Sequence, residues 1–131
     1  MIRDNAVIDL LTWNNSLLDT VLIGIEITRE SLGRADVELK FQARPDSDFS
    51  EIDIKFTGVI EFEFSYERQY TFLDICDLKF LKLADGSFYI ALDPDPSTLP
   101  AAGVTDVQVS ETDHFFVRAN HIEAVVTRKT G

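Results

Sequence analysis

The residues of this chain best suited to acid–base or metal chemistry are its two histidines. His114 and His121 lie seven residues apart, and Asp113 immediately precedes the first. Imidazole and carboxylate groups bind metals such as zinc and exchange protons near neutral pH. The spacing matches neither a His-x-His pair nor the helical His-Glu-x-x-His pattern. We therefore interpret these residues as ordinary strand-end residues, and a metal-dependent enzyme built on them ranks third among our hypotheses.

A proline-bearing loop, residues 93–106, holds a second set of metal-binding groups. Asp93, Asp95 and Asp106 offer oxygens of the kind calcium prefers, but the ligand order and central glycine of an EF-hand are absent. Asp-Pro pairs are also ordinary turn formers. The sequence predicts no metal and no cofactor here, although so long a connection is the first place to search for a function.

Nucleophilic chemistry has one candidate thiol, Cys76. It lies in the run Asp74-Ile75-Cys76-Asp77, and neighbouring carboxylates disfavour the reactive thiolate. The Gly-x-Ser-x-Gly turn of serine hydrolases, the Walker loop and the Rossmann glycine pattern are all missing from the sequence. We predict no catalytic residue and interpret the protein as non-enzymatic.

A stripe of acidic residues is the broadest sign of a binding surface. These acidic residues alternate along the predicted strand so that they lie on one face of it, where Lys55 is the only basic residue. They are Glu51, Asp53, Glu61 and Glu63, with Glu67 beyond them. Such a stripe suits a basic protein partner, because charge complementarity speeds encounter and sets specificity. In the plainer interpretation, cross-strand cations such as Lys40 or Lys79 neutralise it. A second candidate is Trp13, a residue type favoured at binding hot spots but more often found in a core.

These side chains must be positioned by strands, of which residues 51–66 form the clearest. Apolar and polar residues alternate there with the period of two that is typical of a half-buried strand, and Val59 is the one apolar residue on the polar parity. Sixteen residues would extend over roughly 50 Å, whereas a domain of this length is roughly 35–40 Å across. A two-residue hairpin at Thr57-Gly58 would pair apolar with acidic side chains. We therefore predict one continuous strand that bends at Gly58.

The other elements follow from shorter patterns. A short helix is expected near residues 5–13, with Asp4 as its N-cap. Asp85-Gly86 predicts a two-residue hairpin that pairs Leu83 with Phe88. Further strands are expected at 21–28, 34–43, 78–83, 88–92, 114–119 and 122–126. Together they predict a single, mainly β domain over residues 1–131: an antiparallel β-sandwich or partly open barrel of six to seven strands with one short N-terminal helix.

Composition narrows the class of partner. The net charge of −11 argues against nucleic acid and against anionic membranes, because both are bound through Lys and Arg. One cysteine and no signal peptide fit a cytoplasmic protein. No apolar run approaches the roughly 20 residues of a membrane span. An acidic edge strand also permits a homodimer, and the ten phenylalanines permit an alternative function, a small-ligand-binding β domain with an aromatic-lined pocket.

Several segments give the chain a family resemblance. They are Trp13 followed by Leu17-Leu18-Asp19, the strand around Ile23 to Ile27, Phe56-Thr57-Gly58-Val59, Asp77-Leu78-Lys79-Phe80, Tyr89-Ile90-Ala91-Leu92-Asp93-Pro94 and Asp113-His114-Phe115-Phe116. With them the chain resembles small bacterial single-domain β-rich proteins of uncharacterised function, some of which look like immunity proteins of polymorphic toxin systems. The resemblance implies an acidic, immunity-like protein-binding domain and supplies no catalytic residues.

Overall fold

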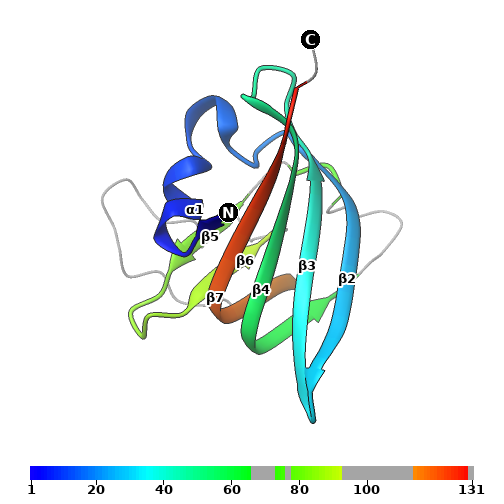
Figure 1. The fold of residues 1–131 in the computed structure, drawn as a ribbon, viewed down its shortest axis with the longest axis vertical. Coiled ribbons are helices and arrows are strands. Elements are labelled where there is room, and N and C mark those ends of the chain that lie inside the picture. The colour runs from blue at the N-terminus through cyan, green and yellow to red at the C-terminus, as the bar shows by residue number, and fades with distance from the viewer. Residues whose placement is uncertain (66–72, 76–77, 93–113, 130–131) are drawn as a thin grey trace.

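The fold is built on one antiparallel sheet with strongly curved strands (Figure 1). Its main apolar core is accompanied by a small second cluster of Tyr89, Ala91 and Phe116. It is known from a computed structural model, which describes residues 1–65, 73–75, 78–92 and 114–129. The elements are β1 (Ile2–Arg3), α1 (Asn5–Leu10), the 3-10 turn η1 (Trp13–Asn15), β2 (Val21–Ser31), β3 (Arg34–Gln42), β4 (Phe49–Phe64), β5 (Lys79–Lys82), β6 (Phe88–Ala91) and β7 (Phe115–Arg128). The strand order is β2-β3-β4-β7-β6-β5, and β1 pairs with β7. This confirms the predicted mainly β, antiparallel class with seven strands and one short N-terminal helix.

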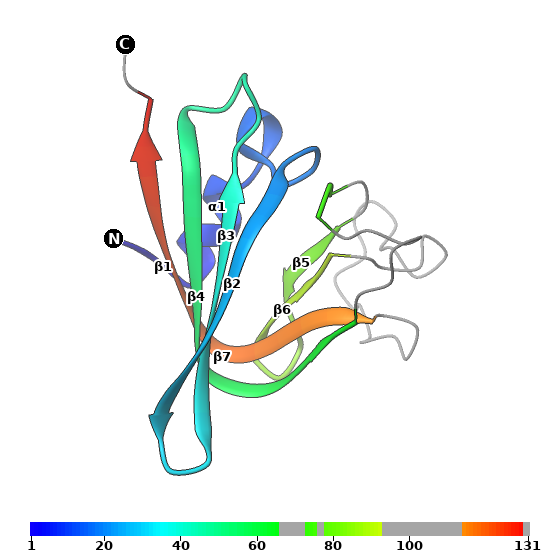
Figure 2. The same ribbon diagram turned by 90° about the vertical axis from the view of Figure 1, so that its right-hand side faces the viewer.

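Two long strands, β4 and β7, form the spine of the sheet. They pair from Phe49 opposite Arg128 to Phe64 opposite Phe115, and they bend together in their shared course (Figure 2). Residues 73–75 hydrogen-bond to the start of β2, at one edge of the sheet. The strand at the opposite edge, β5, begins only four residues after Ile75, so the two edges of the curled sheet approach each other there. One curled sheet of this kind corresponds to a partly open barrel rather than to a sandwich of two sheets.

The bend in β4 lies where it was predicted, at Gly58. This glycine has φ +60°, a left-handed conformation that residues with a Cβ avoid. A bulge follows between Val59 and Glu61 and leaves Ile60 unpaired and 49% exposed. Val59, directly after the left-handed Gly58, packs against the core, which corrects its predicted place on the polar face. The two irregularities offset each other, so Phe64 returns to the core side that Phe56 occupies.

The hairpin at Asp85-Gly86 forms, but its predicted register is wrong by one residue. The observed pairs include Phe80 with Ile90 and Lys82 with Phe88. The N–H of Leu83 donates to the carbonyl of Ser87 at 2.7 Å, so the loop has three residues rather than two. Gly86 with φ +89° takes the left-handed position that such a loop requires. The slip moves Phe80 to the core side and Leu81 to the other.

The N-terminal segment packs against the sheet. Helix α1 contacts β1, β5 and β7, and its residue Val7 is fully buried. Asp4 is the residue before the helix, as predicted, but its carboxylate makes no capping bond. It accepts instead from the N–H of Ile122 in β7 at 3.1 Å, so it ties the N-terminus to the sheet. Among the described residues, no helix is long and apolar enough to cross a membrane.

Candidate functional site

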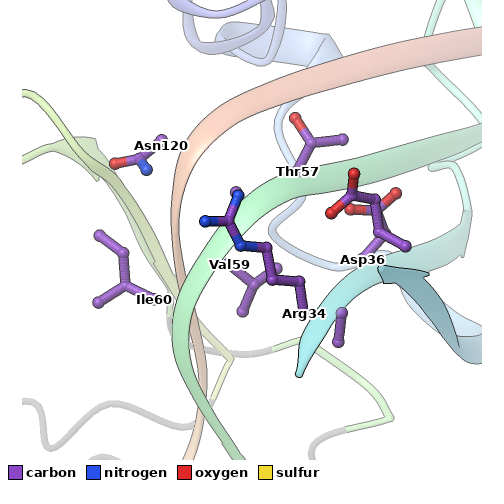
Figure 3. Close-up of a pocket in the computed structure, with 9 residues that line it drawn as sticks. Arg34, Asp36, Thr57, Val59, Ile60 and Asn120 are labelled. Carbon is purple, nitrogen blue, oxygen red and sulfur yellow. The ribbon is translucent and has the colours of Figure 1, made fainter. Parts of the chain in front are cut away.

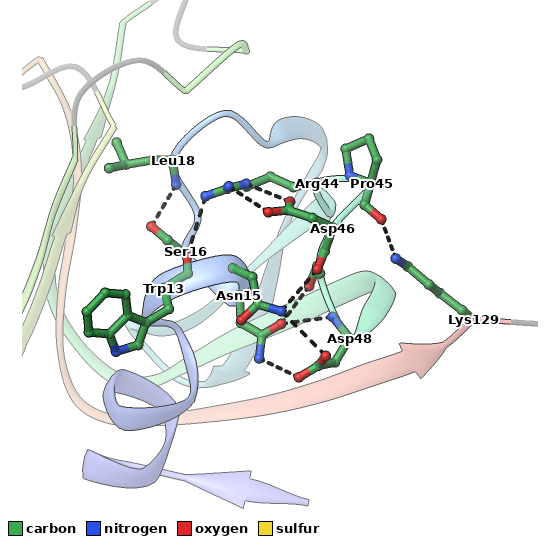
Figure 4. Close-up of polar contacts among 11 residues, drawn as sticks. Trp13, Asn15, Ser16, Leu18, Arg44, Pro45, Asp46, Asp48 and Lys129 are labelled. Atoms are coloured by element: carbon green, nitrogen blue, oxygen red, sulfur yellow. Dashed lines mark hydrogen bonds and ion pairs between the residues drawn. The ribbon is translucent and has the colours of Figure 1, made fainter.

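The most exposed large aromatic side chain in the described part of the chain is Trp13. Its side chain is 89% exposed, so the interpretation of this residue as part of the core is wrong. Its backbone has φ +54°, a left-handed conformation that is unusual for a bulky residue. Strain of this kind persists only where surrounding contacts hold it, and it is concentrated at binding and catalytic sites. Figure 4 shows the indole directed away from the polar contacts that hold its loop.

Asn15 is the centre of those contacts. Its side-chain carbonyl Oδ1 accepts from Ser47 Oγ and from the N–H of Asp48, each at 2.9 Å. Its Nδ2 donates to Asp48 Oδ2 at 3.0 Å. The neighbouring Asn14 donates from Nδ2 to the carbonyl of Asp46 at 3.0 Å. These bonds fasten the 3-10 turn η1 to the turn between β3 and β4.

Arg44 adds a second fastening. Its guanidinium donates to both carboxylate oxygens of Asp46, at 3.0 and 2.9 Å, and Nη1 donates to the carbonyl of Trp13 at 3.4 Å. Lys129, after the end of β7, donates to the carbonyl of Pro45 in the same turn. Three segments far apart in sequence thus hold one tryptophan on the surface (Figure 4). A loop backbone that is held in place before binding loses little conformational entropy when a partner covers it.

Sequence reasoning missed Asn15, Arg44 and Asp48 as parts of this site. Two signals were visible: the amide pair after Trp13 and the turn cluster at residues 45–48. Nothing in either signal shows that they bond to each other across more than 30 residues of chain.

The predicted acidic stripe divides between paired and unpaired members. Glu61 lies 3.5 Å from Arg118, and Glu63 lies 3.8 Å from His114. Asp53 has Lys40 as its cross-strand neighbour, one of the two cations named above. The cross-strand neighbours of Glu51 are the uncharged residues Gln42 and Thr127. Glu67 lies outside the described residues.

Arg118 joins the stripe to the β5–β6 hairpin. Asp85 Oδ1 accepts from the hydroxyl of Ser87 at 2.6 Å and from its N–H at 2.9 Å, while Oδ2 pairs with Arg118. The bonds from Ser87, followed by that from Arg118, lower the pKa of Asp85 from 3.8 to about 2. The same contact with Asp85 raises the pKa of Arg118. The group is a structural ion pair that fixes the hairpin turn.

A pocket of about 520 Å³ opens at the bend of β4 (Figure 3). It lies between the ends of β2 and β3 and the bent segment of β4, with Asn120 of β7 at its side. Its lining mixes charged, polar and small apolar residues: Glu30, Arg34, Ala35, Asp36, Thr57, Gly58, Val59, Ile60 and Asn120. None of these is aromatic, so this pocket is not the aromatic-lined one that a ligand-binding domain was expected to have.

The other predicted candidates do not assemble in the described structure. His114 precedes β7 and pairs with Glu63, whereas His121 lies beyond the bend of β7, 3.4 Å from Asp4. The two histidines therefore contact different carboxylates, on either side of that bend. Within residues 1–65, 73–75, 78–92 and 114–129, no three His, Cys, Asp or Glu side chains gather as a metal site would require. Cys76, Asp113 and the loop residues Asp93, Asp95 and Asp106 lie outside those ranges.

Comparison of the chain with protein-family models, with curated proteins and with solved structures finds no match.

Proposed function

We propose that this chain is a non-enzymatic domain that binds a basic protein, with Trp13 as the anchor of the complex. The observation that carries the proposal is an indole 89% exposed on a left-handed backbone that Asn14, Asn15 and Arg44 hold in place. Exposing a tryptophan forfeits roughly 2 kcal/mol or more of apolar burial, and a strained backbone costs a further 1–3 kcal/mol or so. A residue held at such a cost is suited to burial against a partner.

Charge indicates which kind of partner fits. Asp48, at the base of the Trp13 loop, accepts hydrogen bonds from the neutral amides of Asn14 and Asn15, and no described cation pairs with it. Glu51 follows three residues later and has uncharged cross-strand neighbours. The whole chain carries −11. Lysine or arginine side chains around an apolar slot for the indole are the complement of this surface.

The resemblance to immunity proteins of polymorphic toxin systems suggests the class of partner. A toxin that acts on nucleic acid carries a basic surface, and an acidic inhibitor covers it. We propose that the chain is an immunity-like protein of a bacterial cytoplasm, and that its partner is encoded beside it.

The test is a titration of the chain against the purified product of the adjacent gene. We expect Trp13→Ala to weaken binding by about 2 kcal/mol, or roughly 30-fold, as truncation of a hot spot does. Leu32→Ala is the matched control, because Leu32 is 88% exposed at the hairpin between β2 and β3. Equal losses in the two variants, or no binding by the unchanged protein, would rule the proposal out.

A further inference from the structure

We infer that the outer edge of β2 is a second binding surface, and that it takes up an extended strand whose side chains alternate between apolar and basic. This goes beyond the proposed function, because it uses none of the residues that hold Trp13. The hairpin between β2 and β3 lies at the end of the sheet opposite the β3–β4 turn that carries the Trp13 loop (Figure 1).

Among the described residues, the edge is unpaired along most of its length. β2 is the terminal strand of the sheet and pairs with β3 on one side. On its other side, residues 73–75 bond to its beginning: the N–H of Leu22 donates to the carbonyl of Leu73 at 2.7 Å, and the N–H of Ile75 donates to the carbonyl of Thr20 at 3.0 Å. Beyond that point no described segment pairs with it. An unpaired strand edge offers a row of N–H and C=O groups to another chain.

Bulges limit the usable window to residues 24–29. The pairing with β3 is irregular between Leu22 and Gly24 and again between Arg29 and Ser31, and it is continuous between these points. Bulges twist a strand and interrupt its pairing, so a regular ladder extends over about six residues. This is the length of a short strand segment rather than of a whole domain interface.

The core-side face of this window is incompletely covered. Ile25 and Ile27 are 39% and 52% exposed, whereas their cross-strand partners in β3, Leu39 and Val37, are fully buried. The difference arises because β3 has a strand on each side and β2 does not. Apolar side chains on an added strand would cover both isoleucines, as β2 and β4 flank Leu39 and Val37 of β3.

The opposite face carries an excess of acid. Glu26 lies directly across from Glu38, a like-charge pair that is unfavourable in a sheet. The next residue in that row is Lys55, whose ammonium lies 3.7 Å from Asp36. A second lysine on this face, Lys40, lies opposite Asp53 with its side chain against Gly24, so two lysines serve four carboxylates: Glu26, Glu38, Asp36 and Asp53. A lysine or arginine opposite Glu26 on an added strand would supply the missing charge.

The same charges disfavour a second copy of this chain as the occupant. On the face of Glu26, β2 continues with Thr28 and brings no cation to its own edge. The one basic residue of the window, Arg29, shares the parity of Ile25 and Ile27. Pairing β2 with itself would leave the Glu26–Glu38 pair uncompensated, so a basic strand of another protein fits better.

The probe is a capped heptapeptide of alternating valine and lysine, titrated into the protein and followed by backbone amide NMR. We expect shifts and hydrogen-exchange protection in residues 24–29. A valine–glutamate peptide should not bind, and a valine–lysine peptide N-methylated at alternate residues should lose binding, since it cannot complete the ladder. Glu26→Lys should weaken binding about tenfold, and Asp9→Lys on α1, an equal charge change elsewhere, less than about twofold.

Three results would overturn the inference. Equal binding of the N-methylated peptide would mean that no strand is added. Equal losses in Glu26→Lys and Asp9→Lys would mean that only net charge attracts the peptide. Protection of residues 24–29 that increases with protein concentration in the absence of peptide would mean that a second copy occupies the edge.

Discussion

Gly58 of β4 and Asn120 of β7 meet at the shared bend, where a Cβ on the glycine would lie 3.1 Å from the Cβ of Asn120. The bend therefore depends on the absence of a side chain at Gly58 for two reasons, its left-handed φ of +60° and this close approach. Gly33 shares the first condition, with φ +72°, but has open space around it.

We expect Gly58→Ala to lower the free energy of unfolding by about 2 kcal/mol or more, because left-handed alanine costs about 1–2 kcal/mol and crowding adds to it. Gly33→Ala should cost only the backbone part. Urea denaturation of both variants separates the two contributions. Adding Asn120→Gly to Gly58→Ala should recover the crowding part, and failure to recover it would place the strain elsewhere.

The left-handed Gly58 and the bulge after it together reverse the roles of two neighbouring residues, Val59 and Ile60. We expect Val59→Asn to destabilise the protein by about 2 kcal/mol, because it places an amide against the core, and Ile60→Asn to cost less than about 0.5 kcal/mol at an exposed position. Chemical denaturation measures both. The opposite ranking would mean that the simple alternation of the sequence continues through the bend.

The left-handed backbone at Trp13 predicts an unusual order of stability for two variants, Trp13→Gly and Trp13→Ala. At an ordinary position glycine is less stable than alanine by about 0.5–1 kcal/mol. Because Trp13 has φ +54°, we expect Trp13→Gly to be more stable than Trp13→Ala by about 1 kcal/mol. Thermal unfolding of the two variants decides the sign, and a more stable alanine variant would show that the turn is not left-handed.

The two asparagines that hold the Trp13 loop should differ in how much they stabilise the fold. Asn15→Ala leaves the hydroxyl of Ser47, a residue only 4% exposed, and the N–H of Asp48 without their acceptor. We expect it to cost about 2 kcal/mol, the penalty for stranded polar groups. The adjacent Asn14→Ala removes only exposed bonds and should cost about 0.5 kcal/mol. Denaturation midpoints test the difference, which vanishes if the two amides are equivalent.

The ion pair of Asp85 predicts a pH dependence at the acid end. Its pKa falls from 3.8 to about 2 in the folded protein, so the carboxylate stabilises the fold above pH 3.8 and loses this effect as the pH falls towards 2. The stability gap between the unchanged protein and Asp85→Asn should therefore shrink between pH 4 and pH 2. Ser87→Ala, which removes the largest cause of the shift, should weaken the same dependence. A gap that stays constant over this range would contradict the assignment.

The strands and turns of the fold could be predicted from the sequence because the patterns that mark them are local. Alternation between residues 51 and 66 marks a strand wherever that strand lies, since successive side chains point to opposite faces. Gly58 marked the bend, and Asp85-Gly86 marked a turn, because few residues tolerate the backbone that each requires. The net charge of −11 likewise follows from composition alone.

The side of the sheet that several residues occupy could not be predicted, because it depends on how strands distant in the chain pair with one another. One extra loop residue at Ala84 moved Phe80 to the core and Leu81 away from it. The left-handed Gly58 and the bulge at Ile60 together exchanged the places of Val59 and Ile60. The exposure of Trp13 was equally invisible, since it rests on bonds from Asn15 to Asp48 and from Arg44 across 31 residues or more. The sequence by itself determined which segments are strands, where they turn and what charge they carry. Only the tertiary structure decided which face each side chain occupies, because a register is chosen by the packing of whole strands against one another.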